Sequence, residues 1–191
     1  MSAPTTAVST VPPPDTSSSD GSGQRDAEDD RHARLVPLPG SDNPDELATA
    51  VAATLFGLDP GRYTPTDYEE LLAEALWPQI DADARAAIMA TIARRLPTAD
   101  VWEQMRSVQQ KSDFEVGLVW EPRLGREGRE QQRWPDGVVL RNVSGTLIET
   151  WRPPGEDAQT TTRIVAVTVA LACSPAASPC RLVGIQPNVA T

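Results

Sequence analysis

Histidine is almost absent from this chain of 191 residues. The one histidine, His32, lies in an N-terminal stretch dominated by Ser, Thr, Pro, Gly, Asp and Ala. Histidine is the commonest general base in enzymes and the commonest metal ligand. We therefore expect a scaffold rather than an enzyme, with neither a cofactor nor a bound metal.

Long apolar runs are also missing. No stretch reaches the roughly 18 apolar residues of a membrane helix, and the most apolar one, from Ile164 to Cys173, is interrupted by Thr168. The N-terminus lacks the charged and apolar parts of a signal peptide. Taken alone, these absences predict a soluble, cytoplasmic chain. The net charge of −10 argues against direct binding of nucleic acid, which needs a basic surface.

The only two cysteines, Cys173 and Cys180, flank a short Ser/Pro/Ala connection between two strand-like runs. Closing that ring would stabilise the fold by roughly 2.5 kcal/mol through chain entropy. A zinc site is disfavoured, because four ligands are needed. A disulfide implies an oxidising, extracytoplasmic compartment. We then expect a fragment downstream of a membrane anchor; the alternative is two reduced thiols in a cytoplasmic protein.

The N-terminal region, residues 1–40, is predicted to be a disordered tail or linker. Its Ser- and Pro-rich composition offers too little apolar surface to offset the entropy of ordering. An acidic cluster, Asp26, Glu28, Asp29 and Asp30, is either a solvated segment or an interaction segment. The remainder, residues 41–191, is long enough for one domain with its own core.

Helical periodicity fills the first half of that domain. Four helices are predicted, beginning near Asn43, Thr64, Asp81 and Ala99. The first two begin like capping boxes, with a proline next and an acidic residue three positions on, Glu46 or Asp67. Apolar side chains expected on the helix faces that pack are Leu47, Val51, Leu55, Phe56, Tyr68, Leu71, Leu72, Leu76, Ile88, Ile92, Leu96 and Trp102, and the fourth helix also carries Val101 and Met105.

From Lys111 onwards the apolar period changes to two, which predicts four strands. In the first, Phe114, Val116, Leu118 and Trp120 are expected to face the core, with Asp113, Glu115 and Gly117 on the wet face. In the second and third, the expected core residues are Val139, Val143, Leu147, Trp151, Val165, Val167, Val169 and Leu171. Gly145 is predicted to mark a bulge or bend. Helices before an antiparallel sheet predict an α+β fold: three to four helices packed on a bent four-stranded antiparallel sheet.

A charged loop between the first two strands carries the candidate partner contacts. They are Arg123, Arg126, Arg129, Arg133 and Trp134. An exposed Trp beside Arg is a common anchor in protein interfaces. The alternative is a solvated hairpin connection whose Trp packs on its own domain.

The order of elements resembles the cone-shaped α+β fold of nuclear transport factor two and its relatives. Within that group the chain is similar to type IV secretion assembly factors and TcpC-like conjugal transfer proteins. The positions that carry the resemblance are Tyr68…Leu72, Leu96-Pro97 with Trp102…Met105-Arg106, Phe114-Glu115-Val116, and Arg141 to Thr146 leading into Trp151. It covers about Asp45 to Ile185. Envelope proteins that accompany lipid importers in actinobacteria share this fold.

The resemblance implies a non-catalytic scaffold that self-associates and contacts other subunits of a secretion or transfer channel. In such proteins the domain follows a membrane helix and a linker, so we expect membrane contact only through a missing anchor or a partner. The alternative is a small enzyme or ligand-binding protein that uses the cone as an apolar pocket. That alternative predicts a cavity with converging polar groups among Trp102, Trp120, Asn142 and Trp151.

Overall fold

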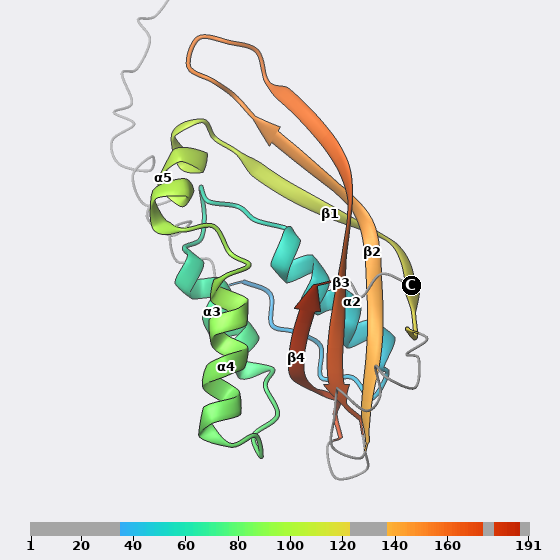
Figure 1. Cartoon of the computed structure of the whole chain (residues 1–191). Coiled ribbons are helices and arrows are strands. Elements are labelled where there is room, and N and C mark those ends of the chain that lie inside the picture. Colours follow the sequence, from blue (N-terminus) through green and yellow to red (C-terminus); the bar gives the residue numbers. More distant parts are fainter. Residues whose placement is uncertain (1–34, 123–136, 174–177, 188–191) are drawn as a thin grey trace, which may run out of the picture. The chain divides into compact units, whose positions relative to one another are not determined.

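The computed structural model describes residues 35–122, 137–173 and 178–187, all within a compact unit that spans Ala33–Thr191. These residues form helices followed by strands (Figure 1). Their bounds are α2 Pro44–Phe56, α3 Pro65–Glu74, α4 Ala82–Ala93, α5 Ala99–Ser107, β1 Lys111–Trp120, β2 Val138–Trp151, β3 Gln159–Ala172 and β4 Arg181–Pro187. The predicted α+β class is confirmed: in the described part of the chain, four helices precede one four-stranded antiparallel sheet.

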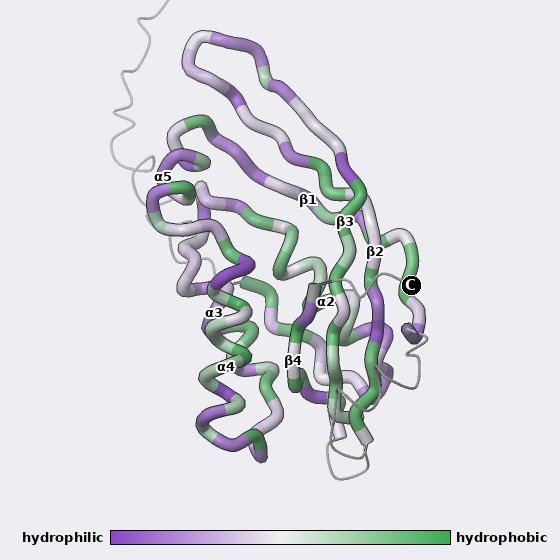
Figure 2. The backbone as a smooth tube through the Cα atoms, in the orientation of Figure 1, coloured by the Kyte–Doolittle hydropathy of each residue, from purple (hydrophilic) through white to green (hydrophobic). Residues whose placement is uncertain are grey.

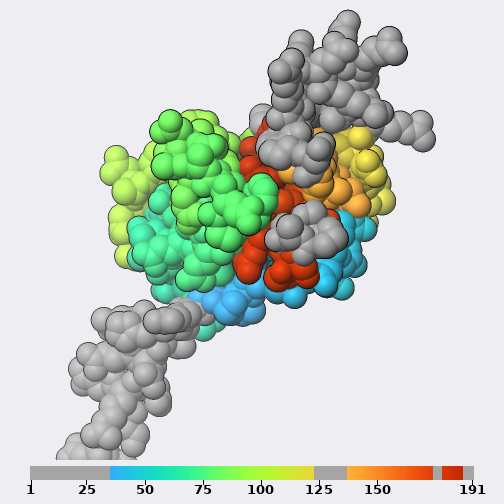
Figure 3. All heavy atoms as spheres, turned by 90° about the horizontal axis from the view of Figure 1, so that it is seen from below, coloured from blue at the N-terminus to red at the C-terminus, as the bar shows by residue number. Residues whose placement is uncertain are grey.

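The sheet has the strand order β1-β2-β3-β4. Strands β2 and β3 pair along their whole length, from Val138 opposite Ala172 to Trp151 opposite Gln159. Helix α2 packs across β1, β2 and β3, and α4 packs beside β4 (Figures 1 and 3). The helices thus cover one face of the sheet, and the far end of the β2–β3 hairpin extends beyond α2.

The two edges of the sheet differ. Beside β4, the N–H of Trp77 donates to the Leu182 carbonyl at 2.9 Å, and the N–H of Leu182 donates to the Ala75 carbonyl at 2.8 Å. The residues that follow α3 therefore cover the β4 edge. On the other side, no described strand pairs with the outer edge of β1.

Helix α3 begins as the sequence predicts, with a complete capping box at Thr64. Helix α2 begins differently. Its cap Asn43 accepts a hydrogen bond from the Asp45 N–H, but the Glu46 carboxylate accepts one from the Ser41 hydroxyl at 2.6 Å. The same Ser41 oxygen accepts the Asn43 N–H at 3.0 Å, so Glu46 has no N–H left to cap. The capping box predicted at Asn43 is therefore wrong, because the Asn43 N–H and the Glu46 carboxylate both bond to the Ser41 hydroxyl instead of to each other.

The core lies between the helices and the helix-facing side of the sheet. Figure 2 shows apolar residues along α2 and along the middle of β2 and β3. The most deeply buried residues of the core include Leu47, Val51, Tyr68, Leu72, Ile92, Trp102, Val143, Val167, Val169 and Leu171. Leu35 and Leu38, near the end of the predicted tail, also pack against this cluster. Residues 1–34 lie outside the described part of the chain, so the prediction for them stays a prediction.

Strand β1 departs from the predicted alternation. The register shifts at Gly117, between Val116 opposite Gly145 and Leu118 opposite Ser144. A bulge inserts one residue and so reverses the faces of the side chains that follow it. Val119 then takes the core position opposite Val143, and Leu118 is 59% exposed. The prediction that Leu118 and Trp120 face the core is wrong for this reason.

Val101 and Gly145 occupy two special positions in the fold. Val101 on α5 is 45% exposed and lines a cavity. A bulge does lie at the position predicted for Gly145, but its extra residue is Gly117 of the neighbouring strand β1. Gly145 is needed because a Cβ there would collide with the Glu115 carbonyl oxygen and lie 2.7 Å from the Phe114 ring.

Candidate functional site

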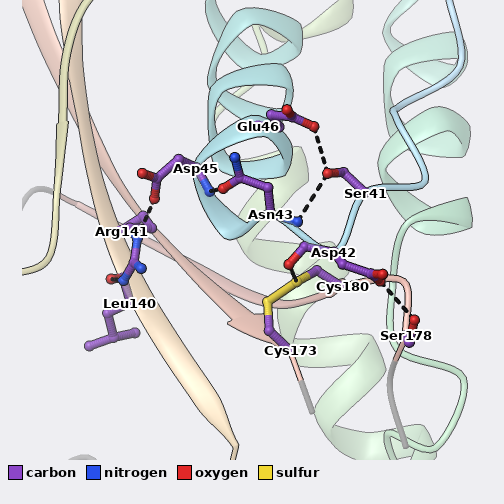
Figure 4. Close-up of a disulfide and its surroundings, with 10 residues drawn as sticks. All are labelled: Ser41, Asp42, Asn43, Asp45, Glu46, Leu140, Arg141, Cys173, Ser178 and Cys180. Carbon is purple, nitrogen blue, oxygen red and sulfur yellow. Dashed lines mark hydrogen bonds and ion pairs between the residues drawn. A yellow bond between two sulfur atoms is a disulfide. The ribbon is translucent and has the colours of Figure 1, made fainter. Parts of the chain in front are cut away.

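The predicted disulfide is present: Cys173 at the end of β3 is bonded to Cys180 just before β4. Figure 4 shows this bridge beside the segment that leads into α2. The N–H of Cys180 donates to the Ser41 carbonyl at 2.9 Å, and the Ser178 hydroxyl donates to the Asp42 carboxylate at 2.7 Å. The bridge therefore closes the β3–β4 connection, and these hydrogen bonds hold that connection against the segment before α2. An oxidised pair is compatible with an extracytoplasmic location.

The candidate partner contacts Arg123, Arg126, Arg129, Arg133 and Trp134 lie outside the described residues. Their role stays a prediction.

The four residues proposed to converge in a pocket do not meet. Trp102 is buried, with its indole N–H donating to the Tyr63 carbonyl at 3.1 Å. Trp151 lies on the helix-facing side of β2, where it lines a cavity. Trp120 and Asn142 pair across β1 and β2 on the opposite face. Trp120 does not face the helices because the bulge at Gly117 turns its side chain to the outer face of the sheet.

Asn142 is fully buried on that outer face. Its Oδ1 accepts a hydrogen bond from the Thr168 hydroxyl at 2.6 Å, and its Nδ2 has no hydrogen-bond partner in the described structure. The Asn142-Val143-Ser144 sequence matches a glycosylation acceptor, yet a buried amide is closed to that modification. We therefore assign the hydrogen-bonded pair Asn142 and Thr168 to the interior of the domain.

A cavity of about 720 Å³ lies between the C-terminal end of α2, α5 and the helix-facing side of the sheet. Its apolar lining comes from Leu55, Phe56, Leu58, Pro97, Val101, Met105, Val108, Leu147, Trp151 and Pro153. Its polar lining comes from Arg95, Gln104, Gln110, Ser112, Glu149, Thr161 and Arg163. The Arg152 N–H donates to the Val108 carbonyl at 2.6 Å, which ties the end of β2 to the residue after α5. This volume falls within the range of small-ligand sites.

The cavity exists because the helix-facing side of the sheet changes character along β2 and β3. Leu147 and Val165 belong to the buried part, but Glu149, Thr161 and Arg163 continue the same face beyond it. These three polar side chains line the cavity. The change from apolar to polar residues is visible in the sequence, because polar residues replace Val at alternate positions before Val165. The strand register was needed to show that they share a face with Glu149.

Of the two arginines that line the cavity, one forms an ion pair with Glu149 and the other does not within the described residues. Arg163 Nε lies 3.1 Å from a Glu149 carboxylate oxygen, and the Glu149 side chain is 21% exposed. The guanidinium of Arg95, on the opposite wall after α4, has no hydrogen bond or ion pair within the described residues. Arg95 is therefore the charged group that is available to a ligand.

The hydroxyl groups of Ser112 and Tyr68 are structural. Ser112 Oγ donates to the Phe56 carbonyl at 2.7 Å and accepts the Leu58 N–H at 3.0 Å, so both its roles are filled. Tyr68 does not line the cavity. Burial is the main cause that raises its pKa to about 12, although its phenol oxygen accepts the Asp59 N–H at 2.9 Å. Neither side chain is placed as a proton donor or nucleophile.

The outer edge of β1, with which no strand pairs in the described part of the chain, is the second candidate site. The Ser112 N–H points away from β2, since it donates to the Leu58 carbonyl at 2.8 Å. Alternation along an antiparallel strand puts the backbone groups of Phe114 and Val116 on that same open side. Val116 is 39% exposed and Leu118 is 59% exposed, and on the outer face of β3 Ile164 is 75% exposed. An unpaired edge with apolar neighbours is a template for another strand.

Comparison with known protein families, with curated proteins and with solved structures finds no match to this chain. Within residues 35–122, 137–173 and 178–187, no three His, Cys, Asp or Glu side chains are grouped so as to hold a metal ion. The same residues contain no helix with the length and apolar character of a membrane span.

Proposed function

We propose that this chain is a non-enzymatic interaction domain of a bacterial cell-envelope complex. Its closest functional class is the assembly factor of a conjugal transfer or type IV secretion channel, on the extracytoplasmic face of the membrane. The open edge of β1 carries the proposal, because it offers backbone groups and apolar side chains to another strand. Contacts with other channel subunits belong to the same proposal.

The occupant of this edge is a second copy of the chain. Antiparallel pairing of β1 with β1 is self-complementary, so one surface on each copy suffices for a two-fold dimer. Leu118 and Val116 would become covered, which removes exposed apolar surface from water. The net charge of −10 opposes this step, since like-charged copies repel each other. Association is therefore expected to strengthen as salt screens that repulsion.

The disulfide supports the envelope location. The bonded pair Cys173–Cys180 joins the β3–β4 connection, and bonds of this kind persist in oxidising compartments. Thiol labelling of intact native cells, with and without reductant, tests this part. Labelling only after reduction, on a protein that external protease cleaves, supports the envelope location. Free thiols on a protected protein would refute it.

Sedimentation velocity of the oxidised full chain tests the self-association. Leu118→Lys places a charge on the exposed edge and is expected to shift the sample to monomer at every salt concentration. Val36→Lys is the matched control, because Val36 is an 83% exposed apolar residue outside the sheet. It should associate like the wild type, apart from a small electrostatic effect. A monomeric wild type at high protein and salt concentration would contradict the proposal.

Deletion of the gene in its host tests the cellular role. We expect transfer of a conjugative element to be lost and to be restored by the wild-type gene, but only poorly by the Leu118→Lys variant. Undiminished transfer after deletion would count against a role in conjugation, although a dimer in vitro would still support an interaction domain.

The cavity favours a second function, the binding of a small ligand. It has the volume of a ligand site and both apolar and charged walls. Ser112 is the β1 residue in the cavity lining, whereas Val116 and Leu118 lie outside the lining, so ligand binding and pairing at β1 do not exclude each other.

A further inference from the structure

The walls of the cavity differ in chemistry. Leu55 and Phe56 at the end of α2, Met105 on α5 and Leu147 on β2 provide apolar surface. Leu147 is 3% exposed, so this part of the cavity reaches into the core. A site of this kind removes the apolar part of a ligand from water, which is favourable roughly in proportion to the area covered.

The charged groups favour an anion. Arg95 and Arg163 both line the cavity, and Glu149 is the acidic residue among the lining side chains. The Glu149 carboxylate is already bonded to Arg163, which leaves the Arg95 guanidinium without a partner in the described structure. A guanidinium can bind a carboxylate with two parallel hydrogen bonds. This local excess of positive charge lies in a chain whose net charge is −10.

We propose that the cavity binds a single-chain amphiphile with a carboxylate head. The apolar chain lies against Leu55, Met105 and Leu147, and the carboxylate binds Arg95. Val101 on α5 also lines the cavity and is 45% exposed, so the apolar chain would cover it. This site is independent of self-association through β1, because β1 residues Val116 and Leu118 do not line the cavity.

Isothermal titration of the oxidised full chain with decanoate tests the proposal, with 1-decanol as the uncharged probe of equal chain length. We expect saturable one-to-one binding of decanoate and binding of decanol that is about fivefold weaker, as for one solvent-accessible charged contact. Added salt should weaken decanoate binding and leave decanol binding almost unchanged.

Two pairs of variants locate the site. Arg95→Gln is expected to weaken decanoate binding about fivefold and to leave decanol binding unchanged. Its control is Arg94→Gln, which removes an equal charge from a neighbouring residue that bonds to Thr91 and does not line the cavity. Val101→Trp should fill the cavity and weaken both probes at least tenfold, while Val101→Ala should bind like the wild type. Thermal unfolding of each variant establishes that it is folded.

Three results would overturn the proposal. They are no saturable binding of decanoate to the wild type, equal weakening by Arg94→Gln and Arg95→Gln, and unchanged binding by a folded Val101→Trp variant. None of these results bears on the dimer test, because Leu118→Lys leaves the cavity intact and should bind decanoate normally.

Discussion

Replacement of Gly145 by alanine tests how β1 and β2 fit together. The Cβ of an alanine there would collide with the Glu115 carbonyl oxygen and would lie 2.7 Å from two carbons of the Phe114 ring. The carbonyl belongs to the backbone of β1, so it moves only if the strand moves. The Phe114 ring is itself held against Phe56, with 5.1 Å between the ring centroids. Neither obstacle is the free end of a flexible side chain.

Overpacking of this kind costs about 1–3 kcal/mol where side chains yield. We expect Gly145→Ala to lie at the upper end, at about 3 kcal/mol, because a backbone oxygen is involved. That corresponds to a fall of roughly 6–12 °C in melting temperature for a domain of this size. Urea unfolding of the oxidised protein, followed by circular dichroism, measures the free energy of unfolding directly.

Gly117→Ala is the matched control on the neighbouring strand. Its Cβ would meet the Ser144 carbonyl oxygen at 3.6 Å and the Gly145 Cα at 3.8 Å, which are ordinary contacts. Since alanine restricts the unfolded chain more than glycine does, this variant should be neutral or more stable by up to about 1 kcal/mol. Equal stability of the Gly145→Ala and Gly117→Ala variants would refute the reasoning.

A second substitution separates the two obstacles. Phe114→Leu in the Gly145→Ala background removes the ring but leaves the Glu115 carbonyl in place. A double-mutant cycle should therefore show a coupling of about 1 kcal/mol and only partial rescue. Full rescue would mean that the ring alone causes the loss of stability.

Two other predictions concern stability. Replacement of both Cys173 and Cys180 by alanine should lower the free energy of unfolding by about 2.5 kcal/mol relative to the oxidised wild type through chain entropy, measured by urea unfolding, and the reduced wild type should show a similar loss; a loss below about 0.5 kcal/mol would contradict it. The pKa of Tyr68 is raised by burial to about 12 in the folded state, so its neutral form contributes stability that is complete below pH 10 and lost as the pH rises towards 12. We expect a loss of about 2–3 kcal/mol between these pH values and a flatter profile for Tyr68→Phe, whereas identical pH profiles would contradict the assignment.

Local patterns in the sequence determined the elements and their order. Proline and acidic residues after Asn43 and Thr64 predicted where two helices begin, and the change of apolar period near Lys111 predicted where the strands begin. The spacing of Cys173 and Cys180 predicted the disulfide. These features depend on neighbours in the chain, so one sequence was enough to find them.

The faces of β1 and the cavity were decided by contacts between distant segments. Nothing near Leu118 in the sequence shows that a bulge at Gly117 reverses its face, because the bulge depends on the register with Gly145. Nor does the sequence around Arg95 show that Arg163 lies across the same cavity. Strand register and the packing of helices on a sheet set both results. The sequence by itself thus determined which elements form, and only the tertiary structure decided which edge and which cavity they leave open.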